Sequence, residues 1–448
     1  MLIKQLTTIL PSNINSGMKI EKSNQIINPF GGINFVIQAI KQSGVLKIID
    51  SQLGSRAPQA EYSYSDLFLN LWSVFFCGGD CAEDLNEHLG DFLKDTPGLA
   101  VANADTVLGV LKRMKTEKEQ VVSEKGKVYE INRHDALNEL NISILKHLGI
   151  LKEVEYHDFD YDNEVLKTEK YDTKKTYKMV NGYFPGMATI GGIPVYFENR
   201  DGNMNVKNNQ DELLERCYKM LNDNGIHINR SRMDAGSYSR KIIEVVDKYS
   251  NLFYIRANRC DFLTNMLLEE RNWEKVEINH VEYEVCSLEY QPFARAKGEE
   301  GKTYRLVVMR RKKSKSQQLD LFTKDNMEYR SILTNDRQST EKEVVEYYNQ
   351  RGAEEKAIDV LNNDFGWNRM PFSFLEENTV FLIVMMMCRN IYAWLIGKFA
   401  EIFSWLKSTF RIKKFIFRFI TVPFKRKKQG LGMTMRVFSR KPYEVLLT

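Results

Sequence analysis

The segment YHDFDYD, residues 156–162, places three acids, Asp158, Asp160 and Asp162, at every second position and separates them with aromatic residues. Aromatic residues are frequent in strands, and a strand directs alternate side chains to the same face. Three carboxylates would then share one face and repel one another unless cations neutralise them or they extend into water. A solvated edge strand is the alternative interpretation, because the spacing alone does not distinguish the two.

The residues that follow this segment alternate between strand and helix patterns. Residues 186–200 are rich in β-branched and aromatic residues bounded by glycine, which is typical of strands. Residues 210–224 and 239–250 have helical spacing, and strand patterns at 226–233 and 253–257 follow them. This strand–helix–strand–helix–strand order predicts an α/β fold with a layered sheet and right-handed crossovers.

The remainder of the chain divides by composition. A turn cluster at residues 28–32 precedes helical spacing up to about residue 113, and we expect an N-terminal helical domain over residues 1–135. The charged residues 114–135 within it indicate a linker or an exposed helix. The other expected units are the first part of an α/β core at 150–260, a β-strand insertion at 261–340, the second part of the core at 341–400 and a basic region at 401–448.

The bulk composition is that of a folded protein. Its 448 residues are 43% hydrophobic and 27% charged, and this length predicts two to four domains. The six cysteines are scattered, and the pair Cys77 and Cys81 has no second pair to complete a zinc site, so we expect free thiols. The N-terminus lacks the pattern of a secretory signal, which indicates the cytoplasm. The apolar stretch from Val380 to Cys388 is too short for a membrane span and predicts a buried helix.

Two further segments carry candidate acids. Asp234 follows the strand pattern of residues 226–233 and precedes a glycine-containing turn and a helix. Acids at that place form sites in α/β sheets, although a simple helix N-cap explains Asp234 as well. If residues 347–355 are helical, Arg351 and Glu355 share a face, and an ordinary surface ion pair is the alternative there.

Taken together, these segments resemble the DDE transposases of bacterial insertion sequences, in the branch with the signature Tyr-x2-Arg-x3-Glu-x6-Lys. Tyr348, Arg351 and Glu355 match its first three members in spacing. DFDYD is similar to the family's first-Asp strand and RMDAGSYS to its second-Asp turn. The strand-rich stretch between Asp234 and Glu355 is similar to its β insertion, so the resemblance covers nearly the whole chain.

The resemblance implies an RNase H-like catalytic core with an inserted β subdomain and flanking helical regions. Asp160, Asp234 and Glu355 would be the catalytic acids and would bind two Mg²⁺ or Mn²⁺ ions. Asp160 is preferred over Asp158, the alternative first Asp, because the family's first Asp lies in an Asp-x-Thr-like context. Asp162 stands here at the position of that threonine.

The implied activity is metal-dependent cleavage of DNA at transposon ends, followed by transfer of the 3′-OH into target DNA. Two metal ions can activate the water and stabilise the leaving oxygen, and hard carboxylate oxygens suit Mg²⁺. Tyr348 and Arg351 would contact phosphates near the transposon end. The signature lysine falls at Asn362, and Lys356 could supply its charge from another turn. Trp273 could stack on a flipped base, with a place in the core as the alternative.

Basic residues provide the expected surface for double-stranded DNA. No acid occurs from Ile402 to Pro442, whereas phenylalanines alternate with a cluster that includes Lys425, Arg426, Lys427 and Lys428. A second cluster contains Arg310, Arg311, Lys312 and Lys313. Phosphate neutralisation is the preferred interpretation, and a membrane surface and a solvated hairpin tip are the respective alternatives.

The resemblance leaves two alternative functions open: a transposase-derived DNA-binding protein without strand transfer, and a stand-alone two-metal nuclease. Because two ends are cut together, we expect a homodimer on paired ends in the nucleoid. The N-terminal helical domain could recognise the terminal repeats, although it contains no clear helix-turn-helix signature.

Overall fold

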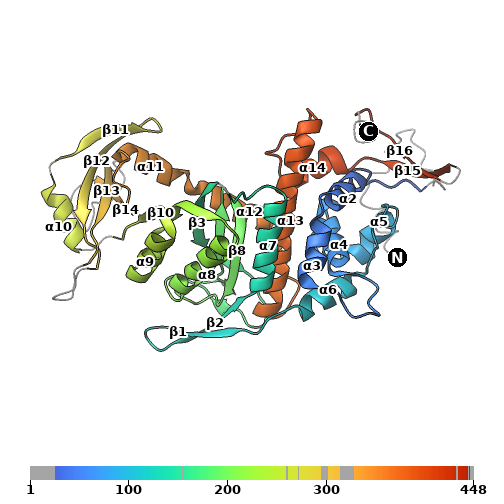
Figure 1. Ribbon diagram of the computed structural model, residues 1–448, viewed down its shortest axis with the longest axis horizontal. Helices are drawn as coiled ribbons and strands as arrows, with labels where there is room; N and C mark the ends of the chain where they lie inside the picture. Colours follow the sequence, from blue (N-terminus) through green and yellow to red (C-terminus); the bar gives the residue numbers. More distant parts are fainter. Residues whose placement is uncertain are drawn as a thin grey trace, which may run out of the picture.

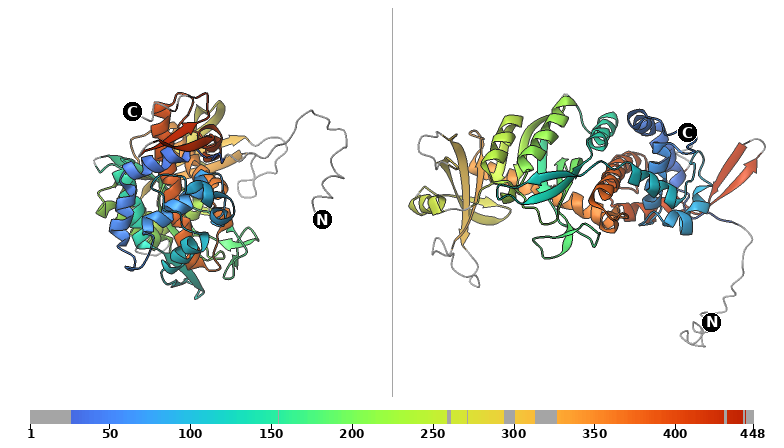
Figure 2. Two further views of the ribbon diagram at one scale, coloured as in Figure 1. Left: turned by 90° about the vertical axis from the view of Figure 1, so that its right-hand side faces the viewer. Right: turned by 90° about the horizontal axis from the view of Figure 1, so that it is seen from below.

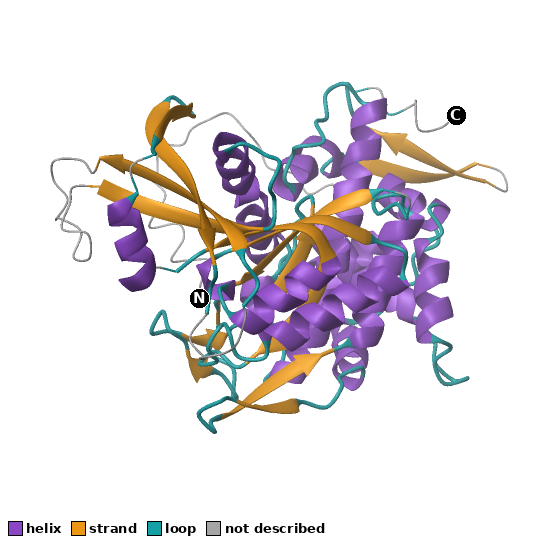
Figure 3. Cartoon of the chain, turned by 60° about the vertical axis from the view of Figure 1, so that its left-hand side comes forward, coloured by secondary structure: helices purple, strands orange, loops and turns teal. Residues whose placement is uncertain are grey.

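The chain forms an elongated molecule with a strand-rich end, a central mixed sheet and a helical end (Figure 1). The computed structural model describes residues 26–153, 155–258, 261–270, 272–293, 301–312, 327–429, 432–441 and 443. Figure 3 shows one long twisted sheet that runs through the strand-rich end and the centre, with helices packed beside it.

The central part of the sheet has the strand order β8-β7-β3-β9-β10. Strand β3 pairs antiparallel with β7 and parallel with β9, while β7 pairs antiparallel with β8 and β9 pairs parallel with β10. The strands are β3 (Tyr156–Asn163), β7 (Gly186–Ile190), β8 (Ile193–Arg200), β9 (His227–Met233) and β10 (Ser250–Arg256). Three antiparallel strands followed by two parallel ones form the expected RNase H-like core, so the predicted α/β class is confirmed.

Helix α8 (Gln210–Asp223) leads from β8 to β9, helix α9 (Arg240–Tyr249) connects the parallel strands β9 and β10, and both cover one face of the sheet. The apolar residues of the 210–224 pattern, Leu213 and Leu214 among them, are buried there together with Phe159 and Tyr161 of β3. Because side chains alternate along a strand, the acids of β3 belong to the opposite face.

The strands of the insertion continue this sheet. After α10 (Asp261–Glu269) they form an antiparallel series, and its last strand pairs antiparallel with β10 of the core. The strands are β11 (Glu274–Ile278), β12 (Val281–Tyr290), β13 (Tyr304–Lys312) and β14 (Met327–Thr334). The insertion therefore has the expected strands, and the backbone of β10 joins them directly to the core.

The charged residues 114–135 form neither a linker nor an exposed helix, so that prediction was wrong. They form a hairpin of β1 (Glu119–Val122) and β2 (Val128–Arg133), and β2 pairs antiparallel with β8 at the edge of the sheet. Tyr129 and Ile131 are buried on one side of β2. The charges lie on an edge hairpin, where charged side chains keep an unpaired strand soluble.

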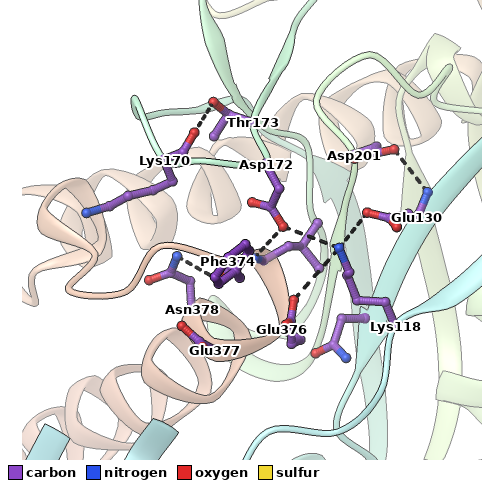
Figure 4. Close-up of polar contacts among 12 residues, drawn as sticks. Lys118, Glu130, Lys170, Asp172, Thr173, Asp201, Phe374, Glu376, Glu377 and Asn378 are labelled. Atoms are coloured by element: carbon purple, nitrogen blue, oxygen red, sulfur yellow. Dashed lines mark hydrogen bonds and ion pairs between the residues drawn. The ribbon is translucent and has the colours of Figure 1, made fainter.

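A short three-stranded sheet extends the core beside the start of helix α13 (Leu375–Ile402). Its strands are β4 (Leu166–Lys167), β5 (Lys174–Lys175) and β6 (Asn181–Tyr183). Figure 4 shows Lys118 between three acids: its Nζ lies 2.6 Å from Glu130, 3.5 Å from Asp172 and 4.0 Å from Glu376. Asp172 also accepts a 2.9 Å hydrogen bond from the backbone N–H of Leu375, which suits an anion at a helix N-terminus. These contacts join β2 and the small sheet to α13.

Helix α13 is the centre of the helical end. It is long and apolar enough to span a membrane, but 78% of its most apolar window is buried inside the protein. The segment Val380–Cys388 is fully buried, as predicted for a core helix. It packs against the N-terminal helices, and the indole N–H of Trp72 donates to the carbonyl of Val384 at 3.1 Å.

The N-terminal and C-terminal regions share this core (Figures 1 and 2). The N-terminal helices are α2 (Ile33–Gln42), α3 (Val45–Leu53), α4 (Tyr64–Phe76), α5 (Gly90–Leu93) and α6 (Ala104–Arg113), with α7 (Asp135–His147) leading into the sheet. The C-terminal elements are α14 (Ile412–Phe415), η5 (Ile416–Ile420), β15 (Phe424–Gln429) and β16 (Gly432–Val437). The backbone N–H groups of Gly31 and Gly32 donate to the carbonyls of Val422 and Ile420.

Candidate active site

Two of the three acids on β3 form bidentate ion pairs with arginines of β9. Arg230 donates to both oxygens of Asp158, at 2.8 and 2.6 Å, and Arg232 donates to both oxygens of Asp160 at 2.7 Å. The ring of Tyr347 lies against both guanidinium groups, 4.1 Å from that of Arg230 and 4.6 Å from that of Arg232. Arg232 also donates to the carbonyl of Tyr347, at 2.9 Å. These contacts join β3, β9 and helix α11 (Glu341–Asn349).

The third acid of β3, Asp162, lies beside Asp234. Tyr161 is in register with Met233 in the parallel β3–β9 pair, so the next residues, Asp162 and Asp234, come at the same edge of the sheet. Burial raises the pKa of Asp162 to about 6; the Arg351 guanidinium opposes this rise and the negative charge of Asp234 adds to it. The structure therefore brings together two carboxylates that the sequence separates by more than 70 residues.

Asp234 also has the N-cap role that the sequence left open. It begins the 3₁₀ turn η2 (Ala235–Ser237), and its Oδ1 accepts a 2.9 Å hydrogen bond from the backbone N–H of Gly236. Within the described chain, the Asp234 side chain accepts no other hydrogen bond. The cap fixes the carboxylate at the strand end through its Oδ1.

The signature motif does not lie on one continuous helix. Tyr348 is in α11, Arg351 is in the 3₁₀ turn η3 (Gln350–Gly352), and Glu355 is in the first turn of α12 (Ala353–Asp364). The condition of one continuous α-helix through residues 347–355 is therefore not met, because the 3₁₀ turn interrupts the α-helical spacing. The side chain of Glu355 lies outside the described residues.

Tyr348 and Arg351 nevertheless reach the two acids. Arg351 Nη2 donates to Asp162 Oδ2 at 2.7 Å, and the Tyr348 hydroxyl donates to the carbonyl of Met233 at 3.2 Å, next to Asp234. Burial raises the pKa of Tyr348, so the phenol stays a hydrogen-bond donor at neutral pH. The site thus contains two carboxylates, one guanidinium and one phenol at the ends of β3 and β9.

The basic cluster of the insertion is largely engaged within the protein. Arg310 donates to Glu284 at 2.6 Å and stacks 3.8 Å over the ring of Trp273, and Arg311 donates to Glu328 at 2.9 Å. Lys312 is exposed, and Lys313 lies outside the described residues. Trp273 is half-buried, packs against the sheet core and donates to the carbonyl of Glu270 at 3.1 Å, so these contacts favour a packing role.

The C-terminal cluster lies on a hairpin that projects from the helical end (Figure 2). Lys425, Arg426 and Lys427 are on β15, and Lys427 is exposed. Arg426 Nη1 lies 3.6 Å from Asp95 of the N-terminal region. The side chain of Lys428 lies outside the described residues.

Sequence reasoning missed the arginines of β9. A signal existed, because Arg230-x-Arg232 repeats the spacing of Asp158-x-Asp160, and two parallel neighbours with this spacing can form consecutive pairs. Asp162 was expected on the shared face of the three acids but was not chosen as a metal ligand, although it is the β3 acid beside Asp234.

A family model and a solved structure match the chain. No curated protein matches the chain. The cryo-EM structure of a piggyBac transposase synaptic complex with hairpin DNA matches 87% of this chain and 78% of that chain, with 12% sequence identity and a TM-score of 0.41. The family model described as transposase DDE domain group 1 matches residues 31–422. Because this match spans most of the sequence, the chain belongs to the family of transposases with a group 1 DDE domain.

Proposed function

We propose that the protein cuts DNA at the ends of its own element and transfers the freed 3′-OH into target DNA. Membership of a transposase family supports this function, and the observation that carries it is the pair of carboxylates Asp162 and Asp234 at neighbouring strand ends. Double-stranded DNA is then the partner, and a homodimer would hold two ends together in the nucleoid.

The donor chemistry of the site fits divalent cations such as Mg²⁺ or Mn²⁺. Carboxylate oxygens are hard ligands, and two mutually repelling carboxylates are stabilised by a shared cation. Asp234 and Glu355 are the expected ligands, and two ions are expected. When bound, they would activate the attacking water or hydroxyl and stabilise the leaving 3′ oxygen.

The geometry favours Asp162 over Asp160 as the ligand from β3. Asp160 is 1% exposed, and both of its oxygens already accept from Arg232. Asp158 is engaged in the same way by Arg230. Among the described residues, Asp162 has a single arginine contact, and it lies beside Asp234, so it is the β3 acid that can share a cation with Asp234.

Arg351 would position the DNA strand by contacting a phosphate, and Tyr348 would support the site from the end of β9. The planar guanidinium of Arg351 matches the oxygens of a phosphate, and its present bond to Asp162 places it at the edge of the acid pair. Tyr348 holds the end of β9 through the carbonyl of Met233, and thereby helps to fix Asp234. We expect Arg351 to exchange part of its contact with Asp162 for a phosphate oxygen when DNA is bound.

The test is to incubate the protein with Mg²⁺ and a DNA fragment that carries the inverted repeats flanking its gene. We expect cuts at the repeat ends, followed by joined products. Asp234→Asn should bind the fragment without cutting it, whereas Asp91→Asn, which changes an exposed acid of α5, should cut normally. Binding without cutting by the wild type would indicate a DNA-binding derivative, and cutting without joining would indicate a nuclease. Undiminished cutting by Asp234→Asn would exclude the assigned site.

A further inference from the structure

A pocket of about 480 Å³ opens where the turn between β7 and β8 meets η3, α12 and α13. Among the described residues, its lining includes the cations Lys356 and Arg389 and the amides Asn349 and Gln350, and no aspartate or glutamate. Three other pockets in the described part of the chain each contain at least two acids. This pocket therefore differs from those three in that the charged residues of its described lining are all cations.

Arg389 supplies a half-buried positive charge that has no acidic partner among the described residues. Its Nη2 donates to the carbonyl of Gly192 at 2.8 Å, and its Nη1 donates to Asn390 Oδ1 at 3.2 Å. Among the described residues, no carboxylate forms an ion pair with it. Burial lowers the pKa of Arg389 to about 10, which still leaves it charged at neutral pH. A guanidinium has five N–H donors, so donors remain for an anion.

Lys356 and the start of α12 add to this cationic character. Lys356 is exposed and forms no ion pair with any residue that the structure describes. Gly352, the N-cap of α12, has no side chain that could accept from the first N–H groups of the helix. The positive end of a helix dipole attracts anions, and here two cations lie beside it.

We propose that this pocket binds a backbone phosphate of the DNA strand that leads to Asp162 and Asp234. The proposal rests on the proposed function and adds Arg389 as a DNA contact. Phe159 pairs with Ile190, so the β7–β8 turn lies beside the Asp158 end of β3. Asp158 and Asp162 are separated by four residues, or about 13 Å at about 3.3 Å per residue. Gln350 lines the pocket and adjoins Arg351 in sequence, so one strand can pass both places.

The test uses a DNA duplex of arbitrary sequence, because phosphate contacts carry no sequence information. Binding is measured by fluorescence anisotropy over a range of salt concentrations for Lys356→Gln, Arg389→Gln and the double variant. Each lost phosphate contact should lower the slope of log K against log[salt] by about 0.9. Lys398→Gln is the matched control, since Lys398 is on α13 but is exposed and paired with Glu401.

Arg389 also holds the β7–β8 turn, so its variant could lose stability. Two measurements do not depend on that variant: the slope for Lys356→Gln, and the protection of Lys356 from acetylation by the duplex in the wild-type protein. An unchanged slope or an unprotected Lys356 would overturn the phosphate pocket, even if the wild type cuts element ends. A reduced slope in a protein that never cuts would support the pocket and reject the proposed function.

Discussion

Asp160 and Asp162 are two residues apart on one strand, yet their surroundings assign them different roles. Asp160 is enclosed, and its charge is matched by the bidentate Arg232, which also donates to the backbone of α11. Asp162 stands at the strand end, where burial and the charge of Asp234 raise its pKa to about 6. The pair of Asp160 and Arg232 holds β3, β9 and α11 together, whereas Asp162 is the β3 acid that we propose as a cation ligand.

Asn substitutions should separate these roles. Asp160→Asn leaves the buried Arg232 guanidinium without its counter-charge, and losing one partner of a buried pair costs about 3 kcal/mol or more of unfolding free energy. Asp162→Asn should leave stability equal or raised above about pH 6, since it removes a repelled carboxylate, but it should abolish Mg²⁺-dependent cutting. Urea unfolding and end cleavage measure the two effects. If Asp162→Asn cuts normally and a stably folded Asp160→Asn does not, Asp160 is the ligand instead.

At this scale the sequence predicted the shared face of the three acids and the strand-end position of Asp234. Both follow from local rules, namely the period of two along a strand and the turn after residue 233. The sequence did not decide which acid of β3 is free to bind a ligand. That depends on the register between β3 and β9 and on arginines 72 residues away from their partners.

At the scale of elements, the interrupted helix around Arg351 determines the shape of the site. Helix α11 ends at Asn349, and the turn η3 carries Arg351 to Asp162 before α12 begins. A 3₁₀ turn has nearly the residue spacing of an α-helix, so periodicity alone predicted one helix through this segment. The β1–β2 hairpin was missed for a different reason, because its charged composition hid a strand whose buried apolar residues are Tyr129 and Ile131.

Helix α7 depends on an uncommon N-cap, His134, which lies at the point where the helical end meets the sheet. Its Nε2 lies 2.8 Å from the carbonyl of Met114 and therefore carries the proton, while Nδ1 accepts from the backbone N–H of Leu137 at 3.3 Å. Burial lowers the pKa of His134 below its usual value, although the hydrogen bond to Met114 opposes this shift. Only the neutral ring can make both bonds.

Acid should therefore weaken the protein through His134. Because its folded pKa is lowered, the unfolded chain binds the proton more readily, and the stability that the neutral ring contributes is lost as the pH falls below about 6.5. We expect a loss of about 1 kcal/mol, the usual value of an N-cap. His134→Asn keeps a capping side chain and should show a smaller change in urea midpoint between about pH 7.5 and pH 5.5. His88→Asn, at an exposed histidine, should behave like the wild type. An equal acid-induced loss in His134→Asn would contradict this account.

At the scale of the whole molecule, the two ends of the chain and the catalytic core share helix α13. Its residues pack against the N-terminal helices and the C-terminal elements, and its first turns join the sheet through the contacts of Lys118 shown in Figure 4. The sequence predicted separate N-terminal and C-terminal regions. It did not predict that these two regions pack into one hydrophobic core. That packing depends on contacts such as the one between Trp72 and Val384, 312 residues apart.

A substitution at Gly32 can test whether the two regions share one core, because Gly32 lies where the N-terminal helices meet the C-terminal elements. A Cβ at Gly32 would lie 2.1 Å from the carbonyl oxygen of Phe419 and 2.7 Å from the Cα of Ile420, so the two segments would have to separate. We expect Gly32→Ala to lower the unfolding free energy by about 3 kcal/mol, the upper range for overpacking, and to speed proteolysis after residue 402. Gly397→Ala, on α13 with nothing within 4 Å of its new Cβ, should be neutral or stabilising by up to about 1 kcal/mol. If Gly32→Ala were as stable and as protease-resistant as the wild type, the two ends would not share one core. A single unfolding transition for both variants is expected, because α13 belongs to the N-terminal core and to the sheet alike.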